Sequence, residues 1–255
     1  MIAVCVKWVG ESATHGLSAA DEAAIEMALR HGTSIRSTVI AVTVGDAAAD
    51  RGLRAALACG VTTAIRVDAP AGMESSAVAA ALTPVVAHST AVWCGDYSAD
   101  RGTGSVPAFL AARLQRQQAL GLVGVEFTDP MRVTRRLDGG RREILRITGP
   151  AVLSVEGSVA RLRRATLRSA LTAQRAEVLP YGTAPGQGNT SVITVRPYRP
   201  RARVLPAPVG ATALDRLRVL TDASAAPQAG QTVEASPAAA AQRIIEVLRD
   251  WGYIP

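Results

Sequence analysis

Residues 99–114, ADRGTGSVPAFLAARL, join glycines and hydroxyl side chains directly to the start of a predicted helix. Gly102 and Gly104 let the backbone approach a ligand closely, while Thr103 and Ser105 offer hydroxyl groups. Free N–H groups at the beginning of a helix favour an anion such as a phosphate. The stretch contains no general base, and it lacks the lysine of the G-x-x-x-x-G-K-[ST] phosphate loop. It therefore predicts a phosphate-binding turn without catalytic residues; the alternative is an ordinary strand-to-helix turn that contains glycines.

The elements around this stretch alternate between short apolar strands, rich in β-branched residues, and longer alanine-rich helices. That alternation predicts an open α/β fold with a mostly parallel sheet covered by helices. Ser18 can cap the first helix, and Asp21 completes a capping box. Ligands bind outside the carboxyl ends of parallel strands, which is the position of residues 95–105. We expect strands at 2–9, 37–45, 63–67, 90–94 and 151–157, and helices at 19–32, 48–59, 75–87 and 106–116.

The pattern changes in the second half of the chain. Residues 132–147 contain two segments of alternating polarity around an Asp-Gly-Gly turn, which predicts a β-hairpin inserted in the fold. Residues 191–210 are rich in proline and arginine and are expected to be extended, whereas 236–253 predict one amphipathic helix. We therefore divide the chain into an α/β domain at 1–190 and a C-terminal arm with its helix at 191–255.

Composition narrows the classes of function. The 255-residue chain has a formal net charge of +7, and Lys7 is its only lysine. A basic balance can indicate nucleic acid, a membrane surface or an acidic partner, but few aromatic residues accompany the arginines, which disfavours nucleic acid. No apolar run is as long as a membrane helix, and the first residues lack the features of a signal peptide, so we expect a cytoplasmic protein without stable membrane insertion. The cysteines and histidines are too scattered for a disulfide framework, a metal site or a catalytic triad.

Six motifs occur in order along the chain: VCVKWV, SAADEAAIEMALRHG, IAVTVG with LRAALACGVTTAIRV, ADRGTGSVPAFLAARL, RRLDGGRREILRITGPAVLSVEG and RRATLRSAL. Together they resemble the beta subunit of electron transfer flavoprotein, the FixA-like family, over residues 1–180. The family's usual patterns are C-V-K-x-V, N-P-x-D-E, D-G-D-T-G-Q-x-G-P, and D-G-G followed by P-A-V. The positions that match them are Cys5, Val6, Lys7, Val9, Asp21, Glu22, Asp100, Thr103, Gly104, Val106, Asp138, Gly139, Gly140 and Pro150.

The resemblance implies a Rossmann-like fold of the adenine-nucleotide alpha hydrolase type, with no hydrolase activity and no catalytic residues of its own. It also implies a heterodimer with an alpha subunit that holds most of the redox FAD, and electron transfer from acyl-CoA-type or other flavin dehydrogenases to an acceptor. In the family this subunit holds a structural AMP, or a second FAD in the bifurcating branch. The residues implied at that nucleotide are Cys5, Lys7, Asp21, Gly95, Asp100, Thr103, Gly104, Ser105 and Val106. Leu167 matches the leucine that docks the dehydrogenase, the C-terminal arm and helix would pack on the partner subunit, and no metal is expected.

Several positions depart from the family's pattern. Ser18 stands in place of asparagine, Gly102 in place of the second aspartate, Ser105 in place of glutamine, and Asp96 where lysine is common. A carboxylate at Asp96 is expected to repel a nearby phosphate, so the pocket would hold AMP differently, hold FAD, or hold neither.

Two further questions stay open from the sequence. Lys7 follows an apolar strand, and we expect its amine to pair with Glu22 or Asp100. The alternative to a flavoprotein subunit is a stand-alone adenine-nucleotide-binding module of the stress-protein type, whose basic tail would contact nucleic acid.

Overall fold

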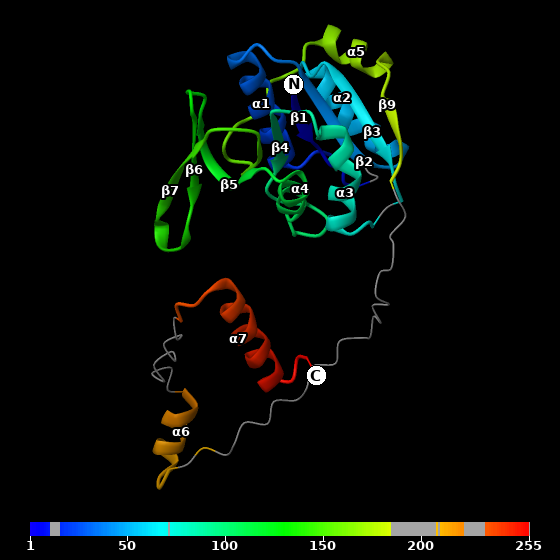
Figure 1. Ribbon diagram of the computed structural model, residues 1–255. Helices are drawn as coiled ribbons and strands as arrows, with labels where there is room; N and C mark the ends of the chain where they lie inside the picture. Colours follow the sequence, from blue (N-terminus) through cyan, green and yellow to red (C-terminus); the bar gives the residue numbers. More distant parts are fainter. Residues whose placement is uncertain (11–15, 71, 185–207, 209, 222–232, 255) are drawn as a thin grey trace. The chain divides into compact units, whose positions relative to one another are not determined.

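Nine strands form one sheet in the order β7-β6-β5-β8-β4-β1-β2-β3-β9. The computed structural model describes residues 1–10, 16–70, 72–184, 208, 210–221 and 233–254 (Figure 1). All neighbouring strands from β5 to β9 along this order are parallel, and the β5–β6 and β6–β7 pairs are antiparallel. The strands are β1 Ile2–Cys5, β2 Val39–Gly45, β3 Thr63–Asp68, β4 Ala91–Gly95, β5 Gln117–Glu126, β6 Met131–Arg136, β7 Arg142–Ile147, β8 Ala151–Val155 and β9 Leu179–Thr183.

Helices cover both faces of the parallel part of the sheet. Ile2 and Val4 of β1 pack in one core cluster with residues of α1 and α2, while Ala3 packs in a second cluster with α3 and α4. Ser18 caps α1 as predicted, because its Oγ accepts the Asp21 N–H at 3.0 Å. The helices of this unit are α1 Ala19–Ser34, α2 Asp50–Ala58, α3 Ser75–Val86, α4 Val106–Leu114 and α5 Leu167–Arg175, with short 3-10 turns at Ala47–Ala49 and Asp138–Gly140.

The predicted α/β fold with an open, mostly parallel sheet and an inserted hairpin is confirmed. The first strand, Ile2–Cys5, is shorter than the predicted 2–9. Beyond it, Lys7 forms an ion pair with Asp100, and Trp8 forms an isolated bridge with Leu17. The sequence analysis missed β5, whose alternation is interrupted at Gly121, a residue with φ of +66° at an irregularity in the pairing. It also missed α5 and β9.

The chain divides into two compact units, Met1–Ile193 and Thr194–Pro255. In the second, the structure describes α6 Ala213–Thr221 and α7 Pro237–Asp250, and α7 confirms the predicted terminal helix. The expected extended segment at 191–210 lies almost wholly outside the described residues, and the packing of this arm on a partner stays a prediction. No helix in the described part of the chain combines the length and hydropathy that crossing a bilayer requires.

Candidate functional site

The candidate site lies where β1, β2 and β4 end, at the carboxyl edge of the parallel sheet. Two adjoining cavities of about 120 Å³ and about 360 Å³ open there. Together they fall within the range of roughly 300 to 1,000 Å³ that is typical of small-molecule sites. The residues that line both cavities are Lys7, Val9, Thr43, Val44, Met73, Val78 and Arg101.

The floor of the smaller cavity is formed by the ends of the strands and carries no charge. Cys5 of β1 lies in register with Cys94 of β4, and both thiols line the cavity. The contact with Cys5, together with burial, raises the pKa of the Cys94 thiol well above its usual value. Thr43 of β2 donates its hydroxyl hydrogen to the Val6 carbonyl at 2.9 Å. We therefore assign the two cysteines to packing under a ligand, without nucleophilic chemistry.

The turn from β4 into α4 depends on glycine. Gly104 has φ of +53°, and a Cβ at this position would lie 1.9 Å from the Asp96 carbonyl oxygen, so no other residue fits without moving the backbone. Gly102 also has a positive φ, +65°. Ser105 precedes α4 without capping it through its side chain, and in the described residues no acceptor takes the N–H of Gly104 or Ser105. These donors, at the positive end of a helix dipole, suit an anion.

One ion pair connects the end of β1 to this turn. The Lys7 Nζ donates to Asp100 Oδ2 at 2.6 Å, which selects Asp100 over Glu22 as its partner. Partial burial opposes ionisation of Asp100, but hydrogen bonds from Lys7 and Ser98 outweigh it and lower the pKa of Asp100 to about 2. The Asp100 carboxylate is therefore ionised at neutral pH, and the ion pair joins the turn to the strand, although both side chains are partly exposed.

Asp21 is a buried acid at the wall of the smaller cavity. Burial raises its pKa to about 7, against the opposing effect of polar contacts with Ser18 and Lys7. The Ser18 hydroxyl donates to Asp21 Oδ2 at 2.9 Å. Gly95 allows this end of α1 to approach β4, because a Cβ there would lie 3.0 Å from Ala20. Near neutral pH the site therefore contains a carboxyl that takes up and releases a proton.

Asp96 departs from the family's pattern and was expected to repel a nearby phosphate. Its side chain lines neither of the two cavities, as the structure describes them. Burial and the nearby charge of Glu156 raise its pKa. The expected repulsion of a phosphate by Asp96 therefore has no support in the cavity's lining.

Arg101 is a site residue that the sequence analysis missed. It lines both cavities, and it donates to the Gly72 carbonyl at 2.6 Å and pairs with Glu74 at 3.6 Å. Its place between Asp100 and Gly102, inside the predicted phosphate-binding turn, could have identified it from the sequence. With Lys7, it adds positive charge at the open side of the site.

The structure brings the predicted nucleotide residues together, and whether they contact a nucleotide stays a prediction. Asp100 lines the larger cavity. Those lining the smaller cavity are Cys5, Lys7, Asp21, Gly95, Thr103, Gly104, Ser105 and Val106. Leu167 lies elsewhere, at the start of α5, where it is 77% exposed.

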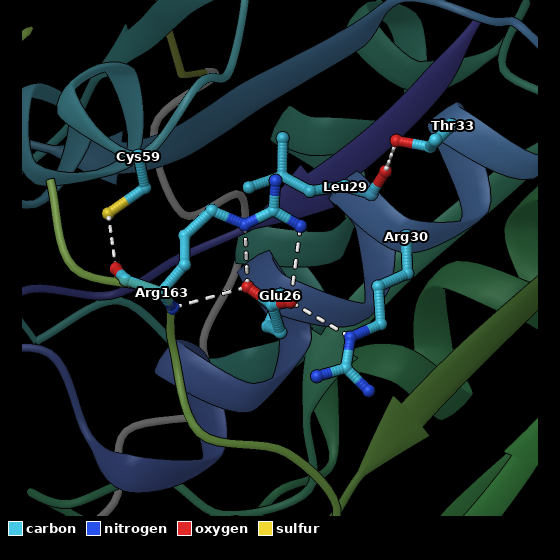
Figure 2. A network of polar contacts seen from close by, with 6 residues as sticks. All are labelled: Glu26, Leu29, Arg30, Thr33, Cys59 and Arg163. Carbon is cyan, nitrogen blue, oxygen red and sulfur yellow. Dashed lines mark hydrogen bonds and ion pairs between the residues drawn. The ribbon is translucent and has the colours of Figure 1, made fainter.

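A polar network holds the segment that leads into α5 (Figure 2). Glu26 of α1 accepts three hydrogen bonds from Arg163, two from its guanidinium and one from its backbone N–H, and a fourth from Arg30. Burial of Glu26 opposes ionisation, but these hydrogen bonds outweigh it and lower its pKa. Cys59 donates its thiol hydrogen to the Arg163 carbonyl at 3.4 Å. The network ties the chain four residues before Leu167 to α1 and α2.

The far end of α5 is held by a second arginine. Arg54 of α2 donates to the carbonyl oxygens of Ala173, Gln174 and Ala176, which complete the last turn of the helix. With both ends held, Leu167 and Leu171 (50% exposed) lie one turn apart on α5 and form an apolar ridge.

The backbone donors and basic side chains of the site suit an anion. In the described part of the chain, no three histidine, cysteine or acidic side chains lie close enough to hold a metal ion. His31 accepts a hydrogen bond from Trp93 Nε1 at 3.2 Å and stacks on Phe127, and burial lowers its pKa, so it belongs to the core.

Comparison with known proteins shows which family this chain resembles. The family model described as "Electron transfer flavoprotein domain" matches residues 6–179. The beta subunit of electron transfer flavoprotein from Bradyrhizobium diazoefficiens is 31% identical over 160 residues, which cover 61% of this chain and 64% of that protein. The same subunit from Methylophilus methylotrophus is 30% identical over 149 residues, 56% of each chain, and that from Dictyostelium discoideum is 28% identical over 162 residues, 62% of this chain and 64% of that one.

The aligned region thus spans less than two thirds of the length of these relatives. The family model, in contrast, covers most of the first compact unit, including the hairpin, α5 and all of the site except Cys5. The chain belongs to the electron transfer flavoprotein domain family.

Proposed function

We propose that this chain is the beta subunit of an electron transfer flavoprotein, which binds an adenine nucleotide at the carboxyl edge of its sheet and pairs with an FAD-carrying alpha subunit. Membership of the family and the names of the relatives support the subunit assignment. When bound, the flavin supplies the redox chemistry, and this chain binds and orients without catalytic groups of its own.

The observation that carries the nucleotide proposal is the space kept free at Gly104. A single methyl group there would collide with the Asp96 carbonyl oxygen at 1.9 Å, so the backbone folds back on itself where side chains are excluded. The result is a concave turn with free N–H donors in front of α4. That is the chemistry with which proteins hold a phosphate.

The rest of the site fits the other parts of an adenine nucleotide. The walls contributed by Val42, Val44, Met73 and Val78 are apolar and suit a flat heteroaromatic base. Because Lys7 is paired with Asp100 and Arg101 with Glu74, the backbone donors would meet most of the phosphate charge. AMP and the adenosine half of FAD share these groups, and the two joined cavities can take either.

The ridge of Leu167 and Leu171 supports a second part of the proposal, docking of an acyl-CoA-type or other flavin dehydrogenase. Its leucines are exposed although both ends of α5 are held by hydrogen bonds. A fixed apolar ridge loses little conformational entropy when a partner covers it. The cytoplasmic location stays a prediction.

Co-expression with the alpha subunit tests the proposal. The complex should purify as a one-to-one heterodimer, and mass spectrometry of the nucleotides released on denaturation should find AMP with about one FAD per pair, or two FAD. One FAD without AMP would contradict a nucleotide on this chain. A chain that binds ATP alone and forms no heterodimer would instead support the stand-alone module.

A further inference from the structure

The β6–β7 hairpin places like charges opposite each other on its exposed face. In the register of the two strands, Arg132 lies opposite Arg146, and Arg136 lies opposite Arg142. All four side chains are exposed, and they lie on the face opposite the one with the buried Met131 and Val133. Like charges directly opposite across an antiparallel pair destabilise it. The hairpin therefore keeps a charge arrangement that its own folding does not favour.

Two of the four arginines pair with carboxylates. Arg132 pairs with Glu126 at 3.5 Å, and Arg136 pairs with Glu156 at 2.6 Å. In the part of the chain that the structure describes, no carboxylate lies within ion-pair distance of Arg142 or Arg146. Both unpaired arginines belong to β7.

Between them lies Ile144, which is 57% exposed. Its partner across the hairpin is Thr134, so the face has a small apolar centre with a free guanidinium on each side along β7. Protein interfaces commonly combine an apolar centre with arginine. The surface formed by Arg142, Ile144 and Arg146 is called the β7 face below.

β7 is also the edge of the sheet. The Leu137 N–H donates to the Arg141 carbonyl at 2.8 Å, which makes these residues a hydrogen-bonded pair. Because hydrogen-bonded and non-hydrogen-bonded pairs alternate along an antiparallel ladder, the residues of the β7 face belong to non-hydrogen-bonded pairs. Their N–H and C=O groups therefore point away from β6, toward the free edge, where another strand can bind.

We propose that the β7 edge docks an extended acidic segment of a partner protein, which adds to the sheet as a further strand. Carboxylates of the segment would lie beside Arg142 and Arg146, and an apolar side chain would lie beside Ile144. The carboxylates of Glu126 and Glu156 next to the other two arginines make the surface a poor match for a continuous polyphosphate. This surface is separate from the proposed nucleotide site and from α5, and the inference rests on neither.

A peptide titration tests this. The blocked, fluorescein-labelled heptapeptide Thr-Glu-Thr-Val-Thr-Glu-Thr is titrated with the full 255-residue chain at 50 mM and 150 mM salt, and anisotropy reports binding. Binding should weaken at the higher salt, because exposed charges are screened. Two control peptides should bind at least tenfold more weakly. One has lysine in place of both glutamates, and the other has proline in place of the two threonines beside valine.

The double charge reversal R142E/R146E tests whether the peptide binds at the β7 face or is attracted by the overall positive charge of the chain. It should weaken binding of the acidic peptide at least tenfold. The control R51E/R113E changes the net charge equally, on exposed positions of α2 and α4, and should leave binding unchanged. Because the reversal turns two repulsive pairs into attractive ones, it should also raise Tm, by about 1 to 3 °C. A lower Tm would contradict the charge argument.

Three results would overturn the proposal. If R142E/R146E and the unaltered chain bound the acidic peptide equally, the β7 face would be excluded as its binding site. Equal binding of the proline peptide would exclude strand addition. Tighter binding of a 20-base-pair DNA duplex than of the peptide at 150 mM salt, lost in R142E/R146E, would assign the face to nucleic acid.

Discussion

The turn between β4 and α4 and the segment that leads into α5 both position a proposed functional surface, but by different physical means. The turn is shaped by the absence of side chains, since a Cβ at Gly104 would lie 1.9 Å from a carbonyl oxygen. The α5 segment is shaped by side chains, through the hydrogen bonds of Glu26 with Arg163 (Figure 2) and through those of Arg54 with the end of the helix.

This difference predicts different consequences of mutation. A backbone conformation that only glycine permits fails completely when a methyl group is added. A surface held by several hydrogen bonds weakens by degrees as each is removed. Mutations in the β4–α4 turn should therefore lower the ligand content, and mutations in the α5 segment should lower stability and docking affinity.

Gly104→Ala has the largest expected effect. The added Cβ forces the turn open, so the purified heterodimer should lose its adenine nucleotide almost completely while its FAD is retained. Mass spectrometry of released nucleotides measures both. The matched control is Gly139→Ala, at a glycine with φ of +69° and open space around it, which carries the strain of a positive φ without the collision. Nucleotide loss in both variants would show that the loss does not come from the collision at Gly104.

Asp21→Asn should remove a pH dependence of stability. The folded pKa of about 7 lies above the usual 3.8, so the stabilisation from the protonated form is present at low pH and lost as pH rises through 7. Relative to the unaltered protein, the variant should gain about 4 kcal/mol between pH 4 and pH 8. Urea unfolding at both pH values measures this. Asp138→Asn, at an exposed turn residue, is the control; equal curves for all three proteins would contradict a buried neutral acid.

Glu26→Gln tests the network before α5. The amide is uncharged and has only one acceptor oxygen, so it can keep only part of the hydrogen bonds from Arg163, and the free energy of unfolding should fall by about 2 kcal/mol at pH 7. Because hydrogen bonding lowers the folded pKa of Glu26, its contribution is present above the usual value of 4.5 and fades as pH falls, so the two proteins should converge in acid. Glu246→Gln, in an exposed pair with Arg243, should change stability little.

Leu167→Ala has the smallest expected effect on the chain itself. Since the side chain is 77% exposed, stability should change by less than about 0.5 kcal/mol, whereas dehydrogenase affinity should fall about tenfold. Surface plasmon resonance with the heterodimer measures the affinity. Ile35→Ala, at an isoleucine that is 51% exposed, should leave affinity unchanged, and an equal loss for both would refute a local docking role.

Much of the fold could be predicted because local patterns agree with the tertiary structure. The capping box at Ser18, the apolar strands and the Asp-Gly-Gly turn each specify their element with few neighbours. The strand β5 could not be predicted in this way, because Gly121 interrupts its alternation and its pairing with β8 shifts register there.

The candidate site was predicted as far as its residues belong to one local motif or to the family pattern. The Lys7–Asp100 pair was anticipated as one of two alternatives, because only the folded chain decides which carboxylate is nearer. Arg101 was missed because arginine is common throughout the chain. Whether Asp96 lines a cavity could not be read from its type, since that depends on how the folded chain packs.

Photolabelling with 8-azido-AMP tests the central claim most directly, because it reports where an adenine nucleotide binds. The heterodimer is irradiated with the probe, digested and analysed by mass spectrometry, with excess AMP as competitor. We expect competed label on peptides that line the two cavities, from residues 72–78 or 95–107, and its loss in Gly104→Ala. Label confined to α5 or to the second unit, or label that AMP does not displace, would contradict a nucleotide site at the carboxyl edge of the sheet.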